Sequence, residues 1–167
     1  MFSNFVTNAP FVPKFSDFNL TGEKGKKIKG SVVLMRKNAL DFNDFTSSAL
    51  DTVSEFLGGG ISVQLVSATN ADQSANGRAK LGKPAYLENW MFSLVPLTAG
   101  DSAFGVNMEW DDQIGVPGAI LVKNNHETEF FLKSVILEDV PGVGRMHFVC
   151  NSWVYPARRY KRDRIFC

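Results

Sequence analysis

Phe104–Trp110, with the sequence FGVNMEW, decides the fold class, because every second residue is large and apolar. Side chains alternate between the two faces of a strand, so this pattern predicts a strand with one buried face. Ile61, Val63 and Leu65 alternate in the same way. Four further segments are apolar, rich in β-branched residues and bounded by turn residues, which predicts strands at 28–35, 119–123, 130–137 and 146–153.

The segments between these strands are irregular. Asp44 to Leu57 has apolar residues at helical spacing and stops before Gly58-Gly59-Gly60, which predicts one short helix inside a long loop. Asn70 to Gly82 is polar and rich in small residues, which predicts a loop. Many short strands with one minor helix indicate an all-β fold, an antiparallel sandwich or barrel.

Length and charge set the domain organisation. The chain has 167 residues, enough for one domain with a proper core. Its 18 Lys plus Arg stand against 17 Asp plus Glu, and this net charge of +1 gives no general attraction to nucleic acid. Residues 1–27 lack periodicity and are expected to form a flexible N-terminal tail. The domain is expected at 28–156, and 157–167 is expected to start a linker.

The two cysteines, Cys150 and Cys167, are interpreted as free thiols in a reducing compartment. The first 27 residues contain no continuous apolar core of a signal peptide and fit a transit peptide poorly. No stretch approaches the roughly 20 apolar residues of a membrane span. We therefore expect a cytoplasmic chain that is at most peripherally associated with membranes.

Catalytic motifs are few. The chain has two histidines, and His147 lies three residues from Cys150 on a predicted strand, so their side chains should point to opposite faces. There is no C-x-x-C pair and no G-x-S-x-G nucleophile elbow. No catalytic residue is therefore predicted. Asp111-Asp112 is interpreted as a charged turn, with a divalent-cation site as the alternative.

Two polar segments have a special composition. Arg158 to Arg164 carries five cations around one tyrosine. A solvated linker is favoured there over a nuclear-import or nucleic-acid patch, because the overall charge is near zero. Asp41-Phe42-Asn43-Asp44-Phe45 interleaves oxygen ligands with aromatics, which suits a surface that touches lipid while a cation bridges to the headgroups. Packing of these phenylalanines onto the neighbouring helix is the alternative.

Several blocks of sequence occur in a characteristic order: Lys27–Gly30, Gly82–Ala85, Trp110–Asp112 with Gly115 and Pro117–Ala119, Glu129–Ser134, Leu137–Pro141, His147–Tyr155 and Asp163–Phe166. Taken together, they resemble one known family, the N-terminal PLAT domain of plant lipoxygenases, most closely the cytosolic 9-lipoxygenases. The resemblance covers essentially Ile28 to Phe166. Pro156 departs from the family, which usually has Asn there.

The resemblance implies an antiparallel β-sandwich of two sheets and a non-catalytic domain that docks on lipid or membranes and on protein. Family members continue past Phe166 into a catalytic domain, which holds a non-haem iron and oxygenates polyunsaturated fatty acids such as linoleate and linolenate to hydroperoxides in oxylipin biosynthesis. The catalytic domain is the implied partner, and no iron ligand can be carried over to this chain. The alternative is a stand-alone PLAT binding module of stressed plants.

Two sets of site residues follow from the resemblance. Aromatic and apolar residues at the last strand and its exit are expected to dock the catalytic domain: Trp153, Tyr155, Tyr160, Ile165 and Phe166. Calcium-responsive PLAT domains gather ligands on loops at one end of the sandwich, beside exposed aromatics. The matching calcium candidates here are Asp41, Asn43, Asp44, Glu88 and Glu127, and the membrane-contact candidates are Phe42, Phe45 and Trp90.

Overall fold

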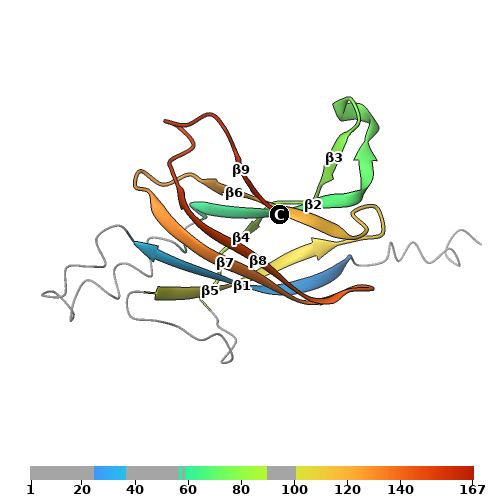
Figure 1. The fold of residues 1–167 in the computed structure, drawn as a ribbon, viewed down its shortest axis with the longest axis horizontal. Helices are drawn as coiled ribbons and strands as arrows, with labels where there is room; N and C mark the ends of the chain where they lie inside the picture. The colour runs from blue at the N-terminus through green and yellow to red at the C-terminus, as the bar shows by residue number, and fades with distance from the viewer. Residues whose placement is uncertain (1–24, 37–56, 58, 90–100) are drawn as a thin grey trace, which may run out of the picture.

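The structure is a computed structural model, and it describes residues 25–36, 57, 59–89 and 101–167. Nine strands and one turn of 3-10 helix make up this part of the chain (Figure 1). They are β1 (Lys26–Arg36), β2 (Ile61–Asp72), η2 (Gln73–Ala75), β3 (Arg78–Leu81), β4 (Ala85–Tyr86), β5 (Asp101–Trp110), β6 (Pro117–Asn124), β7 (Phe130–Val140), β8 (Gly144–Val154) and β9 (Arg164–Phe166).

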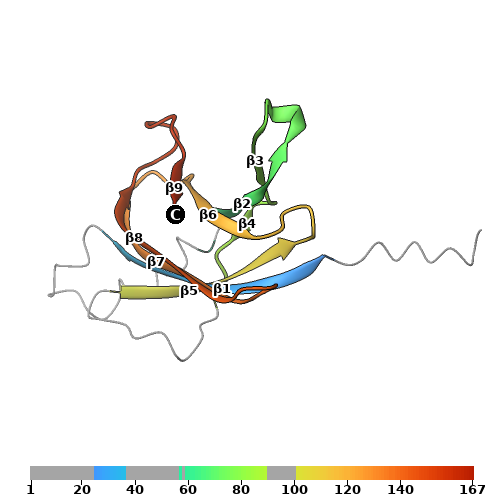
Figure 2. The ribbon, with the colours of Figure 1, turned by 45° about the vertical axis from the view of Figure 1, so that its right-hand side comes forward.

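The strands form two sheets. One has four strands in the order β5-β1-β7-β8, and the other has five, with β3-β2-β6-β9 in line and β4 paired to β2. All pairings between these strands are antiparallel. The two sheets face each other as layers (Figure 2). The antiparallel β-sandwich is therefore confirmed, and all six strands predicted from the sequence are present.

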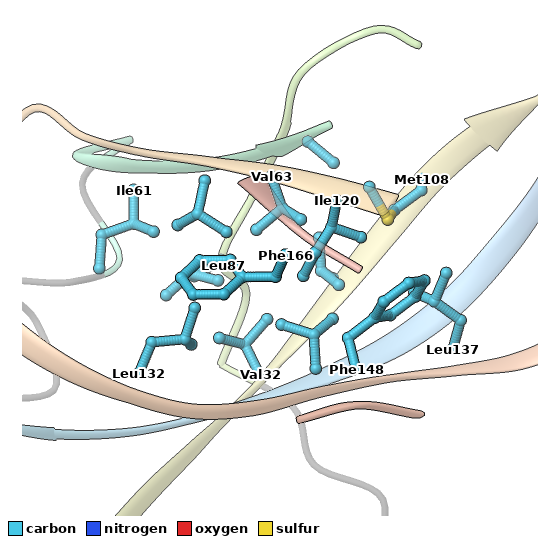
Figure 3. Packing of buried hydrophobic residues seen from close by; sticks show 14 of the residues in the cluster. Val32, Ile61, Val63, Leu87, Met108, Ile120, Leu132, Leu137, Phe148 and Phe166 are labelled. Atoms are coloured by element: carbon cyan, nitrogen blue, oxygen red, sulfur yellow. The ribbon is translucent and has the colours of Figure 1, made fainter. Parts of the chain in front are cut away.

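The core lies between the sheets and draws on both. Val32 and Leu132 project into it from the four-stranded sheet, and Ile61, Val63 and Ile120 project from the five-stranded sheet (Figure 3). Each of these five side chains is at most 1% exposed. Their neighbours along the strands point outward, and for Ile61 and Val63 this is the alternation that the sequence predicted.

The loop predicted for residues 70–82 is wrong, because β2 continues to Asp72 and turns back into β3. This hairpin projects from the sandwich (Figure 1). Its turn has left-handed backbone at Asn76 and Gly77, and the Asp72 carboxylate accepts from the Ser74 N–H at 2.9 Å. Most of its side chains are exposed on both faces, so it lacks the apolar alternation that marks a half-buried strand.

The segment expected to start a linker contributes β9, which pairs with β6. Phe166 drives this pairing, because its ring lies in the core at 9% exposure (Figure 3). Of the expected helix at 44–57, Leu57 is described; it has helical backbone and packs against the core. The rest of that helix and residues 1–24 of the expected tail lie outside the described residues.

Candidate docking surface

The two predicted sets of site residues fare differently. Six candidates for calcium or membrane contact lie outside the described residues: Asp41, Phe42, Asn43, Asp44, Phe45 and Trp90. Glu88 and Glu127 are described. The five docking candidates from Trp153 to Phe166 are all described, so the structure bears mainly on the docking surface.

Glu88 and Glu127 are each bound to a different neighbour. The backbone of Glu88 exchanges two hydrogen bonds with Gly105 of β5, and its carboxylate accepts from the Asn107 side-chain amide at 2.8 Å. Glu127 lies in the connection between β6 and β7, where it pairs with Arg158 at 2.8 Å. Within the described ranges, no three His, Cys, Asp or Glu residues are grouped so that they could hold a metal ion. Calcium binding stays a prediction.

The Asp111-Asp112 pair forms a charged turn. The Asp111 side chain accepts from the Ile114 N–H at 3.0 Å, and the Asp111 carbonyl accepts from the same N–H. The carboxylate therefore serves to close the turn between β5 and β6. This geometry agrees with the interpretation favoured from the sequence.

Trp153 lies on the outer face of the four-stranded sheet. Its neighbour Val154 is in the core, so the side chain of Trp153 points the other way. The indole packs edge-on against Phe131 of β7, with ring centroids 5.5 Å apart, and is half-buried. A partner that covers this face would meet an aromatic pair already in place.

Tyr155 and Tyr160 come together at the start of the connection from β8 to β9. Their ring centroids are 4.8 Å apart, and the two residues are 41% and 55% exposed. The N–H groups of Arg159 and Tyr160 both donate to the Pro156 carbonyl, which folds this connection into a tight turn. The turn presents two large amphipathic rings to solvent in a fixed arrangement.

Ile165 and Phe166 point to opposite sides of β9. Ile165 is 56% exposed and stands beside Leu121 on the outer face of the five-stranded sheet. Phe166 is buried in the core, so its predicted place on an exposed docking face is wrong. Trp153 and Ile165 lie on the outer faces of different sheets. The described docking candidates therefore form a tyrosine pair with separate apolar residues on either side, and not one continuous patch.

Asn124 is a structural residue of this surface that sequence reasoning missed. It is 1% exposed, and its side-chain amide donates to the carbonyls of Thr128 and Val154 at 2.9 and 3.2 Å. Its side-chain oxygen accepts from the His126 N–H at 2.9 Å, and its backbone carbonyl accepts from the Ala157 N–H at 2.7 Å. Asn124 thus fixes the point where residues 155–160, which we call the tyrosine turn, leave β8.

The basic segment around Tyr160 is partly paired with the sandwich. Arg158 binds Glu127, and Arg164 donates to the Ser152 hydroxyl and lies over the Phe166 ring, 5.6 Å from its centroid. All residues from 158 to 165 are exposed. The surface at the exit of β8 therefore combines exposed aromatic rings with solvated cations.

The two thiols are free, as predicted. Burial raises the pKa of the Cys150 thiol to about 11, so this group is protonated at neutral pH. Cys167 is exposed. A reactive cysteine needs a lowered pKa, and Cys150 has the opposite environment.

The PLAT/LH2 domain family model matches residues 61–167, and the chain belongs to this family. The β-sandwich fold and the resemblance seen in the sequence both agree with that assignment. No helix in the described part of the chain has the length and apolar character needed to cross a membrane.

Curated relatives extend the match toward the N-terminus. "Probable linoleate 9S-lipoxygenase 5" of Solanum tuberosum is 56% identical over 144 residues, covering 86% of this chain and 17% of the relative. "Linoleate 9S-lipoxygenase 1" of Arabidopsis thaliana is 54% identical over 141 residues, covering 84% of this chain and 16% of the relative. "Linoleate 9S-lipoxygenase 2" of Oryza sativa subsp. japonica is 53% identical over 148 residues, covering 88% and 17%.

A solved structure titled "Crystal structure of Delta413-417:GS LOX" aligns with a TM-score of 0.46 and 13% identity, over 84% of this chain and 16% of that chain. The family assignment rests on the sequence matches. The chain spans about a sixth of the length of the curated relatives, and it is homologous to the N-terminal domain of lipoxygenases.

Proposed function

We propose that this domain is a non-catalytic docking module of a lipoxygenase, which binds the catalytic domain and helps it to reach lipid surfaces. The observation that carries the proposal is the exposed tyrosine pair, Tyr155 and Tyr160, in a chain 56% identical to a lipoxygenase over 144 residues. The full-length protein would oxygenate linoleate and linolenate to hydroperoxides in oxylipin biosynthesis, with its iron held in the catalytic domain.

The chemistry of the surface supports a protein partner. Tyrosine and tryptophan are enriched at interfaces because each buries a large apolar area and keeps a polar tip for a hydrogen bond. The rings of Tyr155 and Tyr160 are already in contact with each other, so little side-chain entropy is lost when a partner covers them. The remaining five-sixths of the relatives supplies a partner of sufficient size for Tyr155, Tyr160, Ile165 and Trp153.

Contact with a cytoplasmic membrane surface is the second part of the proposal. The Asn125 N–H donates to the Gly60 carbonyl at 2.6 Å, so the connection that carries Glu127 meets the chain entering β2 at one end of the sandwich. Oxygen ligands gathered on loops at one end suit Ca²⁺. The calcium candidates Asp41, Asn43, Asp44, Glu88 and Glu127, with the apolar candidates Phe42, Phe45 and Trp90, define this expected lipid contact.

The docking proposal is tested by capture of a separately expressed lipoxygenase catalytic domain on the immobilised 167-residue chain. Tyr155→Ser with Tyr160→Ser should weaken capture at least about tenfold, because exposed tyrosines at interfaces often act as hot spots. Tyr86→Ser is the matched control, since Tyr86 is 47% exposed on β4 and belongs to no docking candidate. Equal capture by all variants, or no capture by the unaltered chain, would refute the docking role.

The lipid proposal is tested separately by sedimentation with phosphatidylcholine–phosphatidylserine vesicles. Calcium should increase the bound fraction, and Asp41→Asn with Asp44→Asn should abolish that increase. Trp90→Ala should reduce binding with and without calcium. Equal binding in calcium and in chelator would rule out the calcium role and leave apolar contact as the remaining mechanism.

A further inference from the structure

Strand β9 carries a core side chain and a surface side chain on neighbouring residues. Phe166 packs between the sheets among Ile61, Val63 and Leu132 (Figure 3). Ile165 points outward at 56% exposure, at the end of the connection that begins with the tyrosine turn. A strand of three residues cannot move one of these side chains and leave the other in place.

The attachment of β9 to the sandwich is short. Its three residues pair with Val122, Leu121 and Ile120 of β6, and β9 is the terminal strand of its sheet in the described structure. The connection before it, residues 157–163, is mostly exposed. Phe166 is its one buried side chain. Elements with few buried contacts open at a lower free energy than the rest of a domain.

We propose that β9 is a latch that couples the docking surface to the core, so that partner binding holds β9 closed and closure of β9 completes the docking surface. This inference rests on the proposed docking function. When β9 is closed, Ile165 has its place beside Leu121, and the connection that contains the tyrosine turn is held at both ends, by Asn124 and by β9. When β9 opens, Ile165 leaves the surface and one end of the turn is released.

A population argument makes the proposal specific. If a partner binds the closed state alone, then a change that opens β9 weakens binding in proportion to the closed fraction that is lost. Phe166 is 9% exposed and faces the core, so it offers a partner almost no contact. A change at Phe166 should nevertheless weaken docking.

The test combines hydrogen exchange with partner capture on the 167-residue chain. Phe166→Ala should speed amide exchange in β9 and in its partner residues of β6 at least about tenfold, with a smaller change in the pairing of β1 with β5. The same variant should weaken capture of the catalytic domain about fivefold or more, which corresponds to a closed β9 in at most about one fifth of the molecules. Ile165→Ser should weaken capture and leave exchange in β6 near its original rate.

Phe104→Ala is the matched control, because Phe104 is 2% exposed in the same core but lies on β5. It should speed exchange across both sheets and leave capture unchanged at a temperature where the variant is folded. Phe166→Leu and Phe104→Leu form a milder pair if an alanine variant does not fold. The latch is overturned if Phe166 variants leave capture unchanged, or if they change exchange in the same pattern as Phe104 variants. Absence of capture by the unaltered chain refutes docking, whereas the exchange pattern still reports whether β9 opens by itself.

Discussion

Asn124→Ala should destabilise the domain far more than its size suggests. Asn124 is 1% exposed at the end of β6, and it serves three partners through its side chain. The Thr128 and Val154 carbonyls each lose a donor in the variant, and the His126 N–H loses an acceptor. These partners belong to two different segments, the β6–β7 connection and the end of β8, so a single water is poorly placed to replace the amide.

The magnitude follows from burial of the orphaned groups. A buried polar group left without its partner costs about 1–3 kcal/mol. The Val154 carbonyl belongs to a buried residue and should bear the full cost, whereas Thr128 is exposed and can return to water. We therefore expect a loss of about 2–4 kcal/mol in the free energy of unfolding.

Urea unfolding followed by tryptophan fluorescence measures this loss, with the midpoint shifting and the slope unchanged. Asn107→Ala is the control, because its amide hydrogen bond to Glu88 is exposed and should contribute about 0.5 kcal/mol or less. Asn124→Asp keeps the shape but replaces the donor with an oxygen facing two carbonyls, so it should be at least as unstable as the alanine variant. A loss below about 1 kcal/mol for Asn124→Ala would show that this amide does not anchor the surface.

Three further predictions concern stability and reactivity. Lys133→Met should cost about 3 kcal/mol in urea unfolding, since it strips the cation from an Asp101 side chain that is 2% exposed; a loss near zero would show that this carboxylate is solvated. Gly30→Ala should cost about 1–3 kcal/mol, because the added Cβ would lie 2.9 Å from a backbone carbonyl of β7; a thermal midpoint equal to that of the unaltered chain would contradict this close approach. Iodoacetamide at pH 8 should label Cys167 long before Cys150, as read by peptide mass spectrometry. For the same reason, the stability that the neutral buried Cys150 thiol provides should be lost as the pH rises from about 9 toward its pKa of about 11.

The strands that bury one face were predictable, and those that bury little were not. β5 shows strict alternation from Phe104 to Trp110, and that pattern was enough to place it. The β2–β3 hairpin has exposed small and polar residues on both faces, and its pairing depends on the left-handed turn at Asn76 and Gly77. Such a turn is visible in the sequence as Asn-Gly, which could have indicated the hairpin.

The exposure of the docking candidates was predicted in part. Tyr155 and Tyr160 are exposed at the exit of β8, as expected, and their docking role stays a prediction. Phe166 was assigned to the surface as a large aromatic residue at the exit of the last strand, and three residues are too few to show which of them faces the core. Asn124 carries no local signal, since its role appears when Thr128 and Val154 meet it in space. Asn124 and Val154 lie 30 residues apart in the sequence, so no local pattern could predict their hydrogen bond.

The position of β9 at the end of the sheet also sets the order in which the domain can be completed during protein synthesis. β6 is synthesised some forty residues before β9, the strand that pairs with its free edge. Ile120 and Val122 are therefore made before Phe166, whose ring shares their core. A nascent chain that stops short of Phe166 has all of the four-stranded sheet but an unfilled slot in its core. Apolar surface exposed in this interval invites aggregation or chaperone binding, so the speed of translation through the basic segment should influence how much of the protein folds correctly.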